Sequence, residues 1–206
     1  MSIIKYKDGD IIGFSGNYFH SDLINIATYG VPRYSLSHVG LLARKNKNTK
    51  WLVFEANEDV PWQCAVTHKK HDGVQAHSLD LLCKRYKGKI WYYECTIPPK
   101  YWLVRQYGKC LCIGDVKDSL YEACCEKLGV PYDWEGAKQS GGELWSWLQS
   151  IFRQEDTSSF FCSEFVADML RTFNVFETDN VSKWSPNMLM RKLVRDNIYK
   201  PALRIK

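Results

Sequence analysis

The sequence predicts an α+β domain that is rich in strands in its first half and rich in helices in its second half. Runs of strand character and one short helical pattern precede residue 98, and apolar residues then recur at helical spacing from residue 118 to residue 195. The last residues return to strand character. With 206 residues, of which 45% are hydrophobic, the chain fits one domain over residues 1–206.

The first half is read mainly as strands. Gly9-Asp10 predicts a turn, and residues 22–29 show the pattern of a short helix. The polar segment at 45–50 separates two apolar runs, which is typical of a hairpin. We expect strands at residues 11–15, 37–44, 51–56, 75–82 and 89–97.

The second half is read mainly as helices. A helix that starts at residue 118 is expected to stop at Gly129. Ser185 before Pro186 is the pattern of an N-cap followed by proline at the first helical position. We expect helices at residues 118–128, 143–152, 161–173 and 186–195, and a final edge strand at 198–205.

Composition excludes several classes of protein. The net charge is +5, and the two lysine-rich runs, at 45–50 and 68–71, lack the interleaved aromatic residues of a nucleic-acid groove. We therefore expect no nucleic-acid partner. No apolar signal segment and no run of about 18 apolar residues is found, so we expect a cytoplasmic protein without a membrane segment.

The eight cysteines include no Cys-x-x-Cys pair. A cytoplasmic protein keeps its thiols reduced, so a disulfide framework is not expected. His68 and His71 have a spacing seen in metal sites, but they lie in a lysine-rich loop. We expect no metal and no other cofactor, and the cysteine pattern argues against a redox protein.

Cys162 is the strongest candidate for a chemical role. Ser158 and Ser159 precede it where a helix entry is expected, so the thiol falls in the first turn of the helix. The partial positive charge of a helix N-terminus favours the thiolate. The alternative is a small core residue, since free cysteine is commonly buried. The expected inward face comprises Cys162, Phe165, Val166, Met169, Leu170 and Phe173.

A cysteine nucleophile needs a base, and the predicted hairpin offers one. If the turn is symmetric about Asn46-Lys47, then Gly40 faces Val53 and His38 faces Glu55. Directly opposed residues share a face, with Cβ atoms about 4.5–5.5 Å apart. Gly40 would leave room for a helix terminus or a substrate. The alternative is an ordinary cross-strand pair on the surface.

Five short motifs occur in an order that resembles the YiiX-like family, the circularly permuted branch of the papain-like, NlpC-type cysteine peptidases. Lecithin retinol acyltransferase is a more distant relative. The motifs are Gly9-Asp10-Ile11-Ile12, Ser37-His38-Val39-Gly40, Phe54-Glu55-Ala56, Gly129-Val130-Pro131-Tyr132-Asp133 and Phe161-Cys162-Ser163-Glu164-Phe165-Val166. The resemblance implies a permuted papain-like fold, in which an antiparallel sheet or half-barrel packs against helices and the nucleophile lies at a helix N-terminus.

By resemblance, Cys162 is the nucleophile, His38 the base and Glu55 the residue that orients the base. Substrate contacts are expected from Tyr34, Ser37, Tyr132 and Ser163. Residues 59–117 and 134–155 match nothing in the motif pattern and are expected to be variable elaborations that shape substrate binding.

The expected function is a thiol-dependent hydrolase that cleaves an amide bond through an acyl-enzyme. One alternative is a lipid-directed acyltransferase or thioesterase with the same three residues, since the apolar pattern at 143–152 suits acyl chains as well as a core helix. Another is a non-catalytic binding module on the same fold. The expected partner is a small peptide, an acyl amide or a lipid.

Overall fold

A computed structural model describes residues 4–16, 36–58, 60–97, 102–106, 109–112, 120–133 and 158–206. The helices expected at 22–29 and 143–152 lie outside these residues, as do Tyr34 and the whole of the second predicted elaboration.

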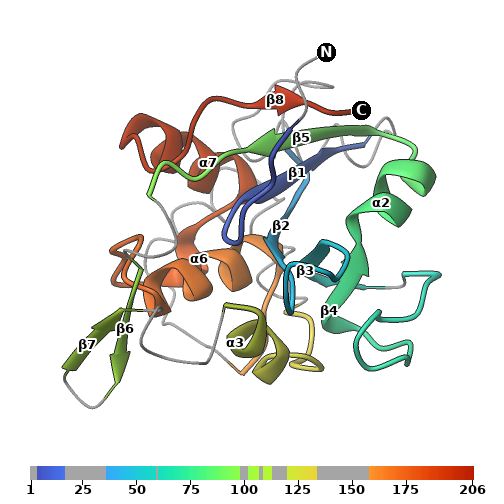
Figure 1. The fold of residues 1–206 in the computed structure, drawn as a ribbon, viewed down its shortest axis with the longest axis horizontal. Helices are drawn as coiled ribbons and strands as arrows, with labels where there is room; N and C mark the ends of the chain where they lie inside the picture. The colour runs from blue at the N-terminus through green and yellow to red at the C-terminus, as the bar shows by residue number, and fades with distance from the viewer. Residues whose placement is uncertain are drawn as a thin grey trace, which may run out of the picture.

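The centre of the molecule is a six-stranded sheet in the order β4-β3-β2-β1-β5-β8 (Figure 1). Every neighbouring pair is antiparallel. A separate two-stranded hairpin is formed by β6 and β7. The strands are β1 Ile11–Ser15, β2 His38–Ala43, β3 Leu52–Asn57, β4 Gly73–Ser78, β5 Lys89–Tyr93, β6 Leu103–Gln106, β7 Lys109–Cys112 and β8 Leu203–Arg204.

Helices cover both faces of the sheet, in an α+β arrangement. On one face, Leu41 and Phe54 pack in the same core as the buried residues of α6 and α7. On the other face, Leu42 and Val53 pack with Leu79 of α2. Figure 1 shows α6 and α7 on one side and α2 on the other. The helices are α2 Leu79–Arg85, α3 Leu120–Glu126, α6 Cys162–Thr172, the short 3-10 helix η2 Val181–Lys183 and α7 Pro186–Arg195.

Several predicted ends of elements are confirmed. Gly129, just beyond α3, has a φ of +85°, the left-handed conformation that favours glycine after a helix. The Ser185 hydroxyl accepts a hydrogen bond from the Met188 N–H at 3.4 Å, with Pro186 at the start of α7. The tail forms an edge strand, because β8 pairs with β5 at the border of the sheet, but this strand is only Leu203–Arg204 and not the predicted 198–205.

The β2–β3 hairpin differs from its predicted register by two residues. Leu42 pairs with Val53, not with Trp51, and this register sets Glu55 opposite Gly40. The reason lies in the turn, where the Asn46 carbonyl accepts from the Thr49 N–H at 3.1 Å and the Asn46 side chain accepts from the Asn48 N–H. The turn is thus centred on Lys47-Asn48 and not on Asn46-Lys47. A shift of two keeps every side chain on its predicted face.

The segment at 59–117, expected to be an elaboration, is integral to the fold. It supplies β4 and β5, which flank β3 and β1 in the central sheet. The expected strand at 75–82 is only partly a strand, because β4 ends at Ser78 and α2 begins at Leu79. A short apolar run cannot distinguish the two by periodicity alone.

The Gly9-Asp10 motif is structural. The buried Asp10 carboxylate accepts hydrogen bonds from the Tyr92 hydroxyl at 2.7 Å and from the Cys95 and Lys7 N–H groups at 2.9 and 2.7 Å. Burial raises the pKa of Asp10 to about 6, although these donors oppose the shift. The motif therefore ties the start of β1 to the end of β5.

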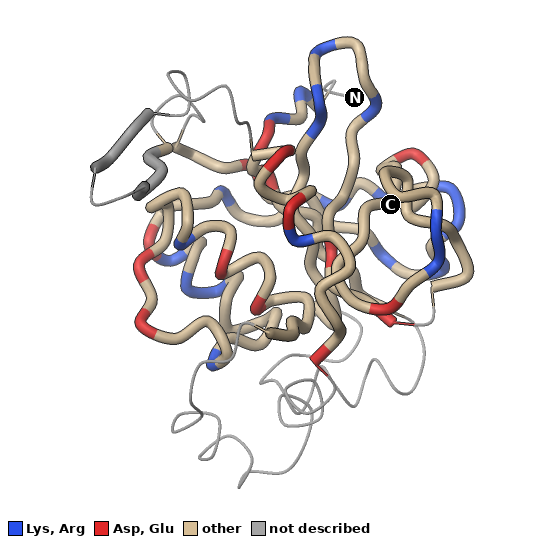
Figure 2. The backbone as a smooth tube through the Cα atoms, turned by 90° about the horizontal axis from the view of Figure 1, so that it is seen from below, with Lys and Arg blue, Asp and Glu red and all other residues tan. Residues whose placement is uncertain are grey.

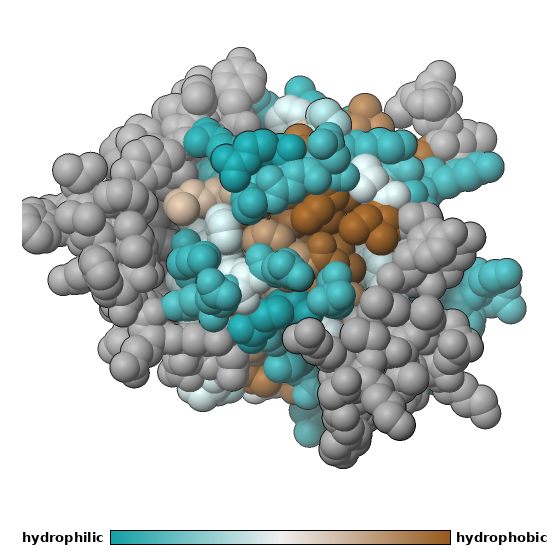
Figure 3. All heavy atoms as spheres, turned by 90° about the vertical axis from the view of Figure 1, so that its left-hand side faces the viewer, coloured by the Kyte–Doolittle hydropathy of each residue, from teal (hydrophilic) through white to brown (hydrophobic). Residues whose placement is uncertain are grey.

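Acidic and basic residues are interspersed along the described chain rather than collected in one strip (Figure 2). Within the described residues, no helix is long and apolar enough to span a membrane. On the face that carries α7, apolar side chains reach the surface between polar ones (Figure 3). Two open depressions adjoin α7, with volumes of about 430 and 540 Å³, and neither has Cys162 or His38 in its lining.

Candidate functional site

Cys162 is the first residue of α6, as predicted, and is only 4% exposed. The helix entry is not made by Ser158 or Ser159. The N-cap is Phe161, whose N–H donates to Glu164 Oε2 at 3.0 Å. Phe161 has no side-chain oxygen to accept the first backbone N–H groups of the helix, which have no intrahelical acceptor. The thiol therefore lies at the positive end of the helix dipole.

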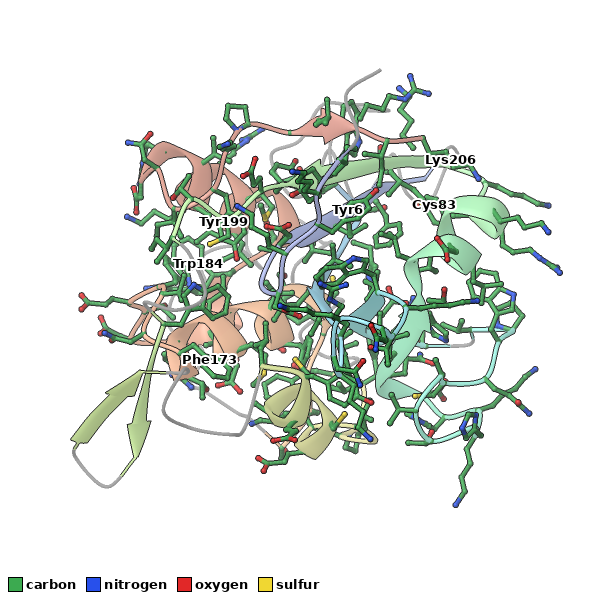
Figure 4. The ribbon with its side chains drawn as sticks, viewed as in Figure 1. Tyr6, Cys83, Phe173, Trp184, Tyr199 and Lys206 are labelled. Carbon is green, nitrogen blue, oxygen red and sulfur yellow. The ribbon has the colours of Figure 1, made fainter. Side chains whose placement is uncertain are left out.

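The apolar face expected for α6 is confirmed, and the helix is buried well beyond it. Ser163 and Glu164 are also fully buried. Ser163 donates from its hydroxyl to the Trp184 carbonyl at 2.5 Å, and Figure 4 shows Trp184 next to α6. This hydroxyl joins α6 to the end of η2, so the geometry gives Ser163 a structural contact where a substrate contact was expected.

His38 and Glu55 meet at the start of β2. The His38 Nε2 and Glu55 Oε2 atoms are 2.6 Å apart. The His38 side chain is 18% exposed and that of Glu55 only 3%. The pair is diagonal rather than directly opposed, because Glu55 faces Gly40. A side chain at position 40 would come within 3.3 Å of Glu55 Cβ.

Cys162 lies close enough to this pair to act on the pKa of His38. Burial alone would lower the pKa of His38, but the charges and hydrogen bonds of Cys162 and Glu55 outweigh burial and raise the pKa to about 10. Burial would raise the pKa of Glu55, but hydrogen bonds from His38 and His77 lower it to about 2. Near neutral pH the arrangement therefore favours an imidazolium flanked by Glu55 and Cys162.

His77 is a member of the site that sequence reasoning missed. Its Nδ1 atom is 2.9 Å from Glu55 Oε1, so each carboxylate oxygen of Glu55 faces one imidazole. The side chain is fully buried. The signal was present in the sequence, because His77 lies within the expected strand at 75–82, but only His38 was treated as a strand histidine.

The other predicted substrate contacts are placed differently. Tyr132 is half-buried and forms a parallel bridge with Phe160, two residues before Cys162. Burial raises the pKa of Tyr132, and the charge of Cys162 adds to the rise. The hydroxyl of Ser37 donates to the Phe14 carbonyl at 3.3 Å, beside His38 in the chain. Tyr34 lies outside the described residues.

The chain that leads into β2 is fixed by α7. Asn187 Oδ1 accepts from the Leu36 N–H, and Asn187 Nδ2 donates to the Leu36 carbonyl, both at 2.9 Å. Both residues are buried. Because Leu36 is two residues before His38, this double hydrogen bond sets where the imidazole enters the site.

The described residues hold no group of three or more His, Cys, Asp or Glu side chains arranged to bind a metal ion. Six cysteines have described side chains, and all of them are free: Cys64, Cys83, Cys95, Cys124, Cys125 and Cys162.

No protein-family model matches the sequence, and no curated protein sequence matches it significantly. Among solved structures, the chain is similar to the crystal structure of the metalloprotein yiiX from Escherichia coli O157:H7, which is assigned to DUF1105. The superposition covers 97% of this chain and 96% of yiiX, with a TM-score of 0.50 and 18% sequence identity. The fold is YiiX-like. At this identity the likeness concerns the fold alone, and the permuted papain-like relation and the link to lecithin retinol acyltransferase stay predictions.

Proposed function

We propose that the protein is a thiol-dependent hydrolase that cleaves an amide bond through an acyl-enzyme. The observation that carries the proposal is the proximity of three residues: Glu55 Oε2 lies 2.6 Å from His38 Nε2, and Cys162, at the start of α6, lies near enough to His38 to raise its pKa. Nucleophile, base and orienting group within reach of one another are the arrangement that covalent catalysis needs.

In the proposed reaction, the Cys162 sulfur attacks the carbonyl carbon while His38 holds the thiol proton. Nε2 of His38 is engaged by Glu55, so Nδ1 is the nitrogen left for the thiol. The backbone N–H of Cys162 stabilises the oxyanion. His38 then protonates the leaving amine, the C–N bond breaks and a thioester remains. Water, deprotonated by His38, attacks the thioester and releases the acid and the thiol.

The same three residues would serve an acyltransferase or thioesterase that acts on lipids, with a different acceptor in the last step. The segment expected to present an apolar surface, at 143–152, lies outside the described residues. No observation on the described residues therefore favours a lipid over an amide, and we retain the amide as the proposed bond.

The metalloprotein description of yiiX raises a second possibility for this fold. Here both oxygens of Glu55 already face imidazoles, and no third ligand accompanies Cys162 and His38 among the described residues. The donor set does not fit a metal site, and no step of the proposed reaction passes through a metal.

The proposal is tested by labelling with a thiol-reactive acyl probe, read as an added mass on the peptide that contains Cys162. Wild-type protein should be labelled at Cys162, with or without a chelator. Cys162→Ala should lose the label, and His38→Ala should slow it by about 100-fold or more. Labelling that is unchanged in both variants would exclude the proposed site, and loss of labelling on chelation would favour a metal-dependent one.

A further inference from the structure

His77 has a bond to the proposed site but no contact with the thiol in the described structure. It lies in β4, on the far side of β3 from His38. Glu55 pairs with Gln75 in the β3–β4 register, so His77 is diagonal to Glu55, just as His38 is on the other strand. The Glu55 carboxylate, which comes from β3, thus lies between the imidazole of His38 on β2 and the imidazole of His77 on β4.

The two bonds have different consequences for Glu55. A glutamate carboxylate that is hydrogen-bonded at one oxygen can still rotate about its Cγ–Cδ bond. A second bond, from His77 Nδ1 to Oε1 at 2.9 Å, fixes the plane of the group while Oε2 faces His38 at 2.6 Å. Hydrogen bonds to an ionised carboxylate are also stronger than neutral ones.

Stability alone does not account for a histidine at position 77. Its side chain is fully buried, and its Nε2 atom has no hydrogen-bond partner among the described residues. Burying an unpaired polar atom costs about 1–3 kcal/mol. The ring also packs edge-on against Trp62 at 5.9 Å, a contact that an apolar ring would make equally well. Among the described residues, the bond to Glu55 is the one interaction that requires an imidazole here.

We propose that His77 is a positioning residue, which donates from Nδ1 to Glu55 and holds that carboxylate in the orientation that stabilises the His38 imidazolium beside Cys162. The inference rests on the proposed function and adds a fourth residue to its site. His77 touches neither substrate nor thiol in this account and acts only through Glu55 and His38.

The test is the pH profile for alkylation of Cys162 by iodoacetamide, measured by peptide mapping. Loss of the His77 donor by His77→Leu should slow alkylation at pH 6 by about tenfold and move the profile to higher pH, as a one-unit change in an interacting pKa does. His77→Asn keeps a donor near the Nδ1 position and should stay within about threefold of wild type. Gln75→Met is the matched control, since Gln75 is buried on the same face of β4 but its amide donates to Asn57.

The outcomes separate this inference from the proposed function. If His38→Ala slows alkylation but His77→Leu has the profile of wild type, His77 does not position Glu55 and the proposed function stands. If neither variant changes the profile, the site itself is wrong. Should His77→Leu fail to fold, His77→Phe replaces it, because a phenyl ring keeps the edge-on contact with Trp62 but offers no donor. Equal profiles for Asn and Phe would then overturn the inference.

Discussion

Glu55 Oε2 lies 2.6 Å from His38 Nε2 although the two residues are not paired across the hairpin. Gly40 is the residue that faces Glu55. A Cβ added to Gly40 would lie 2.5 Å from Val53 Cγ1 and 3.3 Å from Glu55 Cβ. A side chain at position 40 would therefore press on Val53 and on Glu55, the residue that must reach the imidazole, while the predicted role of Gly40 in admitting a substrate or a helix terminus stays a prediction.

Gly40→Val should damage the site as well as the fold. Overpacking of this kind costs about 1–3 kcal/mol, and the atoms that must move include Glu55 itself. We expect a lower melting temperature and acyl-probe labelling of Cys162 slowed by at least about tenfold. Gly129→Ala is the control, because its positive φ strains the backbone but no atom lies within 4 Å of the added Cβ. It should lower stability by about 1 kcal/mol and leave labelling unchanged. Equal labelling in both variants would contradict this role of Gly40.

Glu55 should make the free energy of unfolding depend on pH in the acid range. Its pKa is lowered from 4.5 to about 2 in the folded protein, so the unfolded chain binds a proton more readily than the folded one. The stability that this carboxylate contributes is present above pH 4.5 and is lost as the pH falls toward 2. Glu55→Gln should flatten this part of the curve of unfolding free energy against pH, measured by urea denaturation. A variant that keeps the wild-type slope would show that other carboxylates set the acid limit.

His38 should remain protonated far above the usual range for histidine. Its pKa is raised from 6.5 to about 10, so the stabilisation is fully present below pH 6.5 and is lost as the pH rises through 10. An NMR titration of the imidazole should show no midpoint between pH 6 and 8. In Glu55→Gln the imidazolium loses a charged partner, and the midpoint should move down. A wild-type midpoint near 6.5 would rule out the charge pairing described here.

Asn187 should matter to the site from a distance, because its amide holds both backbone groups of Leu36. Asn187→Leu leaves a buried donor and acceptor unpaired, at a cost of about 1–3 kcal/mol each. We expect lower stability together with slower labelling of Cys162, because the Asn187 amide would no longer hold Leu36, just before β2, in place. Thr178→Val provides a comparison on the same side of the fold, where the lost bonds are to Trp184 and Asn180. It should affect stability without a comparable loss of labelling.

Much of the fold was accessible from local patterns. Ser185-Pro186 and Gly129 marked real helix ends, and the hairpin strands were found with the correct faces. The register was missed because it depends on hydrogen bonds within the turn, where Asn46 bonds to the Asn48 and Thr49 N–H groups. Hydrophobic alternation is unchanged by a shift of two residues, so it carries no information on that choice.

The candidate site was predicted only in part, again because the pairing of strands was not known from the sequence. Cys162, His38 and Glu55 each lie in a segment whose face could be deduced. His77 belongs to the same face through β4, whose pairing with β3 was not predicted because residues 59–117 were taken for an elaboration. The structural use of Ser163 was also hidden, since its acceptor is a backbone carbonyl 21 residues away.

We predict that Cys162 reacts before Cys83 and Cys125, although Cys162 is the least exposed of these three thiols. Cys162 is 4% exposed, whereas Cys83 and Cys125 are half-buried and have pKa values raised chiefly by burial. Limiting iodoacetamide at pH 6, followed by peptide mapping, should modify Cys162 before Cys83 or Cys125, and His38→Ala should abolish that preference. Modification of Cys83 or Cys125 ahead of Cys162 in the wild-type protein would contradict the claim that His38 and Glu55 activate this thiol.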